Sequence, residues 1–204
     1  VEASFGGEAE EQQDAMVFLM GAFFTAVFMM FVILVIQFNT FYQAVVVMSA
    51  IVFSIAGVLF GLLVTGRPFG IVMGGIGVIA LAGIVVNNNI ILIDTYNQMR
   101  KDGVEAYEAA LETGCLRLRP VLLTAITTVL GLMPMVLGVN VDLLTPSLGL
   151  GAPSTQWWTQ LSSAIAGGLA FATVLTLLLT PALLVLGNRA GQAFGRLTSR
   201  FRTT

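Results

Sequence analysis

The sequence contains no histidine, a single cysteine and few charged side chains. Histidine is the usual proton shuttle near neutral pH and the commonest metal ligand, so the simplest forms of both chemistries are missing. Cys115 has no partner for an internal disulfide. Only 10% of the 204 residues are charged, whereas a soluble domain carries about a quarter. These absences exclude an ordinary soluble domain and indicate an integral membrane protein.

The residues that are present are mostly apolar, with 57% hydrophobic residues and a mean hydropathy of +0.93. A membrane-spanning helix needs about 20 apolar residues. Five stretches meet this requirement, and none carries an ionised residue between its ends. We therefore predict an all-α membrane protein built as a bundle of five transmembrane helices. The transmembrane bundle covers residues 16–188, with spans at about 16–36, 44–65, 69–93, 120–139 and 157–186.

Lysine and arginine predict the orientation of these spans. Eight of the nine lie between spans three and four or after span five, and only Arg67 lies on the other side. We expect the N-terminus outside and the basic tail, residues 189–204, inside. Trp157 and Trp158 would then lie in the outer interfacial belt.

The segments outside the spans have different characters. Residues 1–15 lack the basic start and apolar core of a signal peptide, and we expect them to end an outer region of a longer chain, because the sequence begins at Val1. In the link 99–119, Val104, Tyr107 and Leu111 have the spacing of an amphipathic helix, and Gly114 is placed to end it. We expect this helix on the inner membrane surface, with a solvated loop as the alternative.

Small residues recur at steps of four on three spans, where they allow helices to approach closely. Gly57 and Gly61 lie on span two, and Gly70 and Gly74 on span three, which also contains Gly83. Span five offers a third stripe: Ala164, Gly168 and Ala172. The pattern predicts a compact bundle.

Polar side chains interrupt span three at Asn87, Asn88 and Asn89, with Asp94 at its inner edge. At about 100° per residue, Asn87 and Asp94 share one stripe with Gly83 and lie about 10 Å apart. Asn87 and Asn89 lie about 200° apart around the helix axis. At most two of the asparagines can therefore face one partner helix.

Span four has a single polar stripe of Thr124, Thr127 and Thr128, with Arg117 seven residues before Thr124. Such threonines often donate to a carbonyl of their own helix, which is one interpretation. The other is a polar path for an ion or proton through the bundle. Span five carries a lighter stripe: Thr173, Thr176 and Thr180.

A proton path needs a group that titrates within the membrane, and no Asp, Glu, His or Lys lies inside any span. Asp94 is only at an edge. If the polar stripe handles protons, the carboxylate must come from another segment or chain.

Four stretches resemble the resistance-nodulation-division (RND) transporters, and among these the hydrophobe/amphiphile efflux pumps. The tenth to twelfth membrane helices of the family are similar to GIVVNNNIILID, RLRPVLLTAITTVLGLMPMVLG and GGLAFATVLTLLLTPALLVL. GEAEEQQDA resembles the end of the second periplasmic region, before the eighth helix.

The resemblance implies helices eight to twelve of a twelve-helix permease in the bacterial inner membrane. Such a pump is a secondary transporter and not an enzyme. It exports hydrophobic or amphiphilic compounds by proton antiport and needs no cofactor other than protons. Its implied partners are membrane lipid, the N-terminal half of the pump, a homotrimer, a periplasmic adaptor and an outer-membrane channel, without nucleic acid. The coupling aspartates lie in the N-terminal half, so we expect this chain to be inactive alone.

The candidate proton-relay residues are Asn87, Asn88, Asp94, Arg117, Thr124 and Thr128. In the family, Asn87 stands where many members have lysine and others asparagine, and Thr124 and Arg117 match relay positions of helix eleven. Asn88 matches a common second asparagine, whereas Asn89 departs from the usual alanine. The resemblance implies that Asn87 and Asn88 are neutral hydrogen-bonding partners for aspartates of the other repeat.

Other functions remain as alternatives. RND-type transporters of lipid or other non-drug cargo share the same bundle. A stand-alone membrane scaffold subunit is another possibility. An intramembrane enzyme is disfavoured, because the sequence has no HExxH, no GxSxG and no paired intramembrane aspartates.

Overall fold

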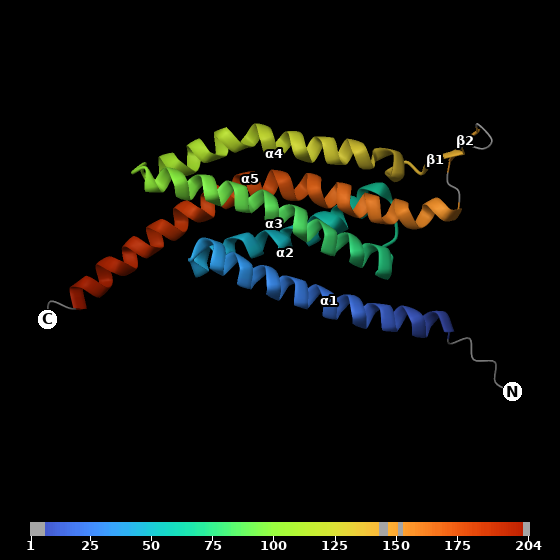
Figure 1. Ribbon diagram of the computed structural model, residues 1–204, viewed down its shortest axis with the longest axis horizontal. Coiled ribbons are helices and arrows are strands. Elements are labelled where there is room, and N and C mark those ends of the chain that lie inside the picture. Colours follow the sequence, from blue (N-terminus) through green and yellow to red (C-terminus); the bar gives the residue numbers. More distant parts are fainter. Residues whose placement is uncertain (1–6, 143–146, 151–152, 202–204) are drawn as a thin grey trace.

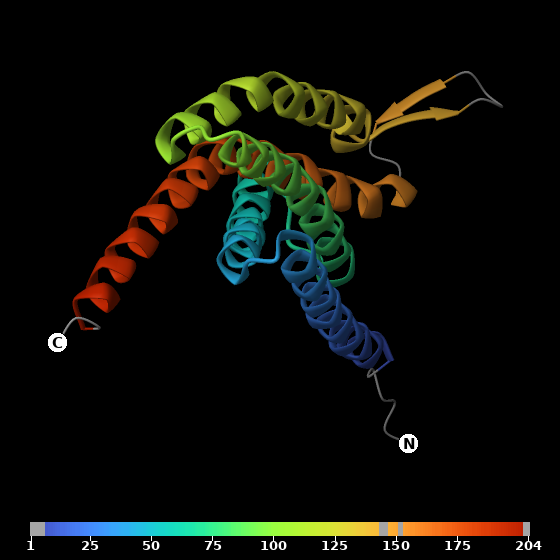
Figure 2. The ribbon, with the colours of Figure 1, turned by 60° about the vertical axis from the view of Figure 1, so that its left-hand side comes forward.

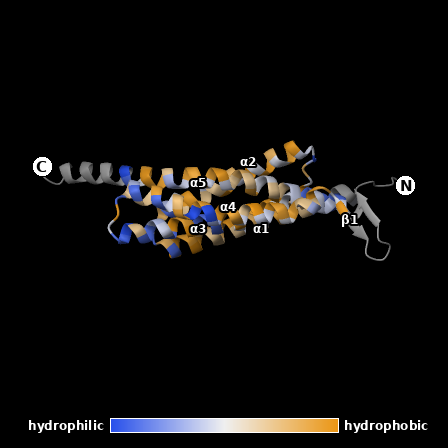
Figure 3. Cartoon of the chain, turned by 90° about the horizontal axis from the view of Figure 1, so that it is seen from above, coloured by the Kyte–Doolittle hydropathy of each residue, from blue (hydrophilic) through white to orange (hydrophobic). Residues whose placement is uncertain are grey.

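The computed structural model describes residues 7–142, 147–150 and 153–201. These residues form helices α1 (Gly7–Phe38), α2 (Phe41–Thr65), α3 (Ile71–Lys101), α4 (Ala106–Val136) and α5 (Pro153–Phe201), with strands β1 and β2 between α4 and α5 (Figure 1). All five helices are long and apolar enough to cross a membrane. Hydrophobic colouring runs along them, and hydrophilic colouring gathers where α3 joins α4 (Figure 3). The predicted five-helix, all-α membrane fold is confirmed.

Helix α5 lies at the centre of the bundle and packs against α2, α3 and α4. Helix α4 arches over α3 and α5, and α1 lies at the far side (Figure 2). Helix α1 packs against α2 and α3, and most of its large apolar side chains are exposed. The N-terminal helix is therefore the most loosely held element of the bundle.

The predicted small-residue stripes make the α2–α5 crossing. A Cβ atom added to Gly61 would lie 2.6 Å from the Cα of Gly167, so the two backbones leave no room for a side chain. A Cβ atom added to Gly57 would likewise lie 2.9 Å from the Cβ of Phe171. Gly83 of α3 has open space around it instead, so it does not pack within this bundle. The small residues predicted close helix packing, whereas the pairing of α2 with α5 through Gly61 and Gly167 comes from the structure.

The turn after α2 has a clear local cause. Gly66 has φ of +64°, the left-handed conformation that favours glycine, and its N–H donates to the carbonyls of Leu62 and Leu63. Helix α2 therefore ends at Thr65, where the sequence predicted the end of span two.

The sequence predicted a short helix between spans three and four that ends at Gly114. This segment is helical from Ala106, but it forms the first part of α4, so the predicted end was wrong. Its place on the inner membrane surface stays a prediction. Helix α3 continues to Lys101, and α4 begins at Ala106 and runs through Gly114 and Pro120 without ending. A glycine inside a helix costs only about 1 kcal/mol relative to alanine. Burial of Ala109, Ala110 and Thr113 against the bundle keeps this segment helical.

The ends of the elements differ from the predicted spans. Helix α1 begins at Gly7, inside the segment 1–15, and α5 continues into the basic tail. The segment between predicted spans four and five contains an antiparallel pair, β1 (Val139–Asp142) and β2 (Ser147–Leu150), in which Val139 lies opposite Leu150. Hydropathy locates apolar segments but does not show where helices continue beyond them.

Candidate coupling site

The three consecutive asparagines of α3 point in different directions. Asn87 is exposed, Asn88 is half-buried and Asn89 is buried with 1% of its surface accessible. The prediction that the three cannot share one partner helix is confirmed.

An exposed stripe runs along α3 through Gly83, Asn87 and Asp94. Thr124 and Thr127 are exposed on the neighbouring helix α4. These polar groups lie on helices that are long and apolar enough to span a membrane. An uncovered carboxamide in hydrocarbon is costly, so this face requires a protein partner or water.

Arg117 ties the two helices together at one end of this stripe. Its Nε donates a hydrogen bond of 2.7 Å to Oγ1 of Thr95, the residue after Asp94. The half-buried guanidinium thereby stays at the end of the bundle where α3 joins α4, hereafter the α3–α4 end. This contact supports the sequence prediction that Arg117 lies at the end of the polar stripe.

The threonines of α4 donate into their own helix. Thr124 donates to the carbonyl of Val121 at 2.9 Å, and Thr128 donates to the carbonyl of Thr124 at 2.8 Å. Thr127 donates to the carbonyls of Leu123 and Thr124. These bonds agree with the interpretation that the threonine hydroxyls donate to carbonyls of their own helix. Each hydroxyl oxygen still has lone pairs that can accept a hydrogen bond from a partner.

Sequence reasoning missed a buried contact between α3 and α5. Thr180 Oγ1 donates to Asn89 Oδ1 at 2.9 Å, and both residues are buried. The Nδ2 amide of Asn89 and the hydroxyl of Thr173 are buried without a hydrogen-bond partner among the described residues. The threonine stripe of span five was the available signal. Its members Thr173, Thr176 and Thr180 are all buried, and Thr180 contacts α3 at Asn89.

A second missed contact joins α2 and α3. Gln43 Nε2 donates to Asn97 Oδ1 at 2.7 Å, and Asn97 Nδ2 donates back to Gln43 Oε1 at 2.9 Å. Both residues lie just outside the predicted spans 44–65 and 69–93, where sequence reasoning sought no interhelical bonds. The pair fixes the two helices at the α3–α4 end.

Within the part of the chain that the structure describes, no group of three or more His, Cys, Asp or Glu side chains is placed to hold a metal ion. The candidate residues of α3 and α4 are instead neutral amides and hydroxyls, together with the carboxylate of Asp94 and the guanidinium of Arg117. Such groups can orient a titrating partner by hydrogen bonding but supply little proton capacity of their own. The fold and site define a multi-pass helical membrane protein with polar side chains exposed on its membrane-spanning helices.

The AcrB/AcrD/AcrF family model matches residues 1–188. The chain therefore belongs to this family of RND permeases. It is 35% identical over 176 residues to the swarming motility protein SwrC of Bacillus subtilis (strain 168), a match that covers 86% of this chain and 16% of that protein. It is 32% identical over 187 residues to the cobalt-zinc-cadmium resistance protein CzcA of Cupriavidus metallidurans, covering 91% of this chain and 16% of that protein.

A crystal structure of a heavy metal efflux pump (crystal form II) superposes with a TM-score of 0.71 at 30% identity and covers 87% of this chain and 16% of that one. The chain thus spans about one sixth of the length of these relatives. The described helices therefore correspond to a membrane portion of a permease of this family.

Proposed function

We propose that this chain supplies the neutral half of the coupling site in an efflux pump driven by the proton-motive force. Asn87, Asn88 and Thr124 would hydrogen-bond carboxylates that another membrane segment, the N-terminal half of the pump, contributes. Exposure of Asn87 and Asp94 on a membrane-spanning helix is the observation that carries this proposal. Burial of these groups against a polar partner removes the cost of leaving them in hydrocarbon.

The chemistry of an amide distinguishes this site from one with lysine. An amide can orient a carboxylate through hydrogen bonds, but it cannot become a counter-charge. Proton uptake would then change the net charge of the site, with Arg117 at one end of the polar stripe as a fixed cation that could compensate. Asp94 would extend the polar path toward the α3–α4 end, and Thr128 would extend it in the opposite direction along α4.

We propose the remaining assembly on the basis of family membership and the distribution of charge. The N-terminus would lie in the periplasm and the C-terminus in the cytoplasm of a bacterial cell, with the bundle in the inner membrane. The complete pump would form a homotrimer with a periplasmic adaptor and an outer-membrane channel.

Two cargo classes have support. The sequence resemblance to hydrophobe/amphiphile efflux pumps favours apolar or amphiphilic organic compounds. Similarity to proteins named for cobalt, zinc and cadmium resistance, or for nickel and cobalt resistance, favours heavy-metal cations. We propose organic amphiphiles as the first candidate and metal cations as the second.

The coupling role is tested in the full-length protein. Asn87→Ala should abolish export while leaving the protein folded and present in the membrane in normal amount, because the packing of this bundle does not depend on the exposed Asn87 side chain. Gln98→Ala, an exposed change on α3 outside the candidate site, is the matched control. Full export by the Asn87 variant would refute the proposal.

The cargo is tested separately in a host that lacks its own pumps. Extrusion of an amphiphilic dye by the full-length protein, without protection against Zn²⁺, Cd²⁺, Co²⁺ or Ni²⁺, supports the first class. The reverse pattern supports the second class, whereas coupling through Asn87 applies to both.

A further inference from the structure

A groove of about 700 Å³ lies between α4 and α5 at the α3–α4 end. Its floor contains small residues, among them Ala110, Gly114 and Ala182. A Cβ atom added to Gly114 would meet nothing within 4 Å, so the space above the floor is open. The groove is also lined by large exposed apolar side chains: Tyr107, Leu111, Leu118, Leu178 and Leu186. Small residues below and large ones around them give the surface its depth.

The length of the groove corresponds to one membrane leaflet. Along α5 it extends from Leu177 to Arg189, about 18 Å at 1.5 Å per residue. One leaflet of the hydrocarbon core is about 15 Å thick. A partner helix about 10 Å wide and 18 Å long would occupy roughly 1400 Å³, about twice the groove, so a narrow acyl chain suits its depth better.

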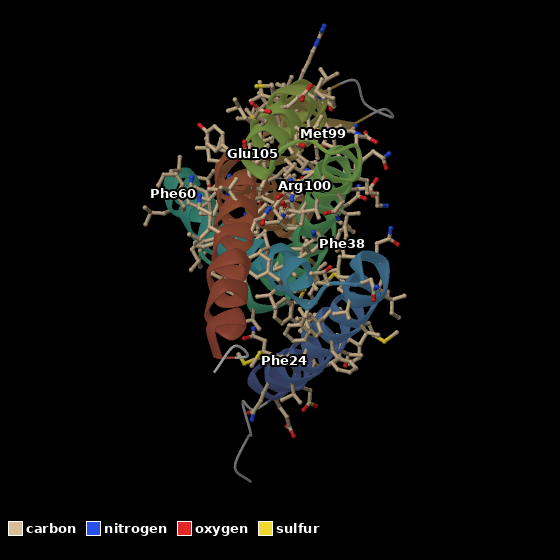
Figure 4. All side chains as sticks on the ribbon, turned by 90° about the vertical axis from the view of Figure 1, so that its left-hand side faces the viewer. Phe24, Phe38, Phe60, Met99, Arg100 and Glu105 are labelled. Carbon is tan, nitrogen blue, oxygen red and sulfur yellow. The ribbon has the colours of Figure 1, made fainter. Side chains whose placement is uncertain are left out.

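The groove ends at a positively charged pocket. Tyr107 and Arg189 line both the groove and an adjoining pocket of about 140 Å³, which Arg100 and Glu105 also line. Figure 4 looks onto this end and labels Arg100 and Glu105 beside the start of α4. Arg100 directs Nη1 to the carbonyl of Val104 at 2.7 Å, which leaves further N–H donors on its guanidinium. Two arginines and one glutamate thus line this pocket, which gives it a net positive charge.

The groove is separate from the proposed coupling face. On α4 it takes the helical row of Tyr107, Leu111, Gly114 and Leu118. Arg117 belongs to a different row, which reaches Thr95 of α3. A membrane segment that covers Asn87 therefore need not cover the groove.

We propose that this groove is a binding site for an anionic phospholipid. An acyl chain would lie along the floor past Gly114, and the phosphate would bind Arg100 and Arg189. Guanidinium groups match phosphate geometry and carry permanent charge, which explains a preference for anionic over zwitterionic headgroups. The site adds a lipid ligand to the protein and is independent of which cargo the pump exports.

The test uses the detergent-solubilised full-length protein and native mass spectrometry. Phosphatidylglycerol and phosphatidylcholine with identical acyl chains are titrated separately. Wild-type protein should retain phosphatidylglycerol with at least about fivefold higher affinity, and Arg100→Gln and Arg189→Gln should each lower that affinity about fivefold. Gly114→Leu, which fills the open floor and favours the helix, should remove one bound lipid of either class per chain.

Two matched variants control for unrelated effects. Arg119→Gln removes an exposed charge of α4 that does not line the groove, and Gly21→Leu adds the same side chain at an exposed glycine of α1. Both should bind lipid as wild type does. Equal affinities for the two lipids, or arginine variants that match Arg119→Gln, would overturn the headgroup assignment. An unchanged lipid count in Gly114→Leu would overturn the groove itself.

Discussion

Asn89 and Thr180 form a polar contact inside an otherwise apolar helix interface, and the two partners are not equivalent. Thr180 lies on α5, directly before Pro181. If Asn89 is lost, the Thr180 hydroxyl can donate instead to a backbone carbonyl one turn earlier on the same helix. Asn89 has no such alternative, and its Nδ2 already lacks a partner among the described residues. The cost of breaking the contact therefore depends on which residue is removed.

Thr180→Val should destabilise the protein by about 1–2 kcal/mol, because it leaves a buried carboxamide with neither donor nor acceptor satisfied. Asn89→Leu, which is close in size and has no polar atoms, should cost less than Thr180→Val. The double variant should recover most of the loss, because two apolar groups of similar shape replace a polar pair. Equilibrium unfolding of the full-length protein in detergent measures all three.

The account would be contradicted if the two single variants lowered the free energy of unfolding equally and the double variant lowered it by the sum of the two losses. That result would mean that Asn89 and Thr180 do not interact in the membrane. Thr127→Val, an exposed threonine of α4 whose hydroxyl bonds its own helix, is the control for loss of a hydroxyl.

Residue-level prediction succeeded where helical geometry alone decided the outcome. The divergence of Asn87 from Asn89 follows from 100° per residue, and the structure confirms it. The partner of Asn89 could not be predicted, because the relative rotation of α3 and α5 depends on packing that sequence periodicity does not specify. The functional roles of Asn87, Asn88, Asp94, Arg117, Thr124 and Thr128 stay predictions.

At the scale of elements, the contact between α2 and α5 depends on two glycines that approach backbone to backbone. Gly61→Ala should destabilise the full-length protein by about 1–3 kcal/mol, because the new Cβ has no free volume beside Gly167. Gly21→Ala, at an exposed site of α1 with open space, should instead stabilise by about 0.5–1 kcal/mol through helix propensity. Thermal unfolding in detergent compares the two variants.

If Gly61→Ala lowers the stability while Gly21→Ala raises it, the loss of stability at Gly61 arises from packing. If both variants were equally stable, the close approach of α2 and α5 would not hold in the membrane.

The elements themselves were largely predictable because each needs about 20 apolar residues. Their extensions were not. Helix α4 passes Gly114 and Pro120 because Ala109, Ala110 and Thr113 pack on the bundle, and Thr113 Oγ1 contacts the sulfur of Met99 at 3.4 Å. Tertiary packing outweighed the local signals that predicted an end, and it left Tyr107 and Leu111 exposed beside the groove.

At the scale of the whole molecule, the proposed coupling site would need carboxylates from a membrane segment outside this chain. The 204-residue chain expressed alone should insert into the membrane but support no export. Co-expression with the remaining part of the pump as a separate chain should restore export, because the partner helices would cover Asn87. Dye and metal extrusion assays at matched expression levels measure export by the chain alone and by the co-expressed pair.

Export by the isolated chain would contradict the proposed division of the coupling site. An Asn87→Ala chain is the negative control for the co-expression arm, because it should assemble without restoring transport.

The position of α5 has a consequence for the timing of biogenesis. Ribosomes deliver helices in order from the N-terminus, and α5, on which α2, α3 and α4 all pack, follows those three helices in the chain. The earlier helices therefore enter the membrane before the helix that covers their glycine faces. A chain interrupted before Pro153 would leave Gly57 and Gly61 of α2 without the α5 backbone against which they pack.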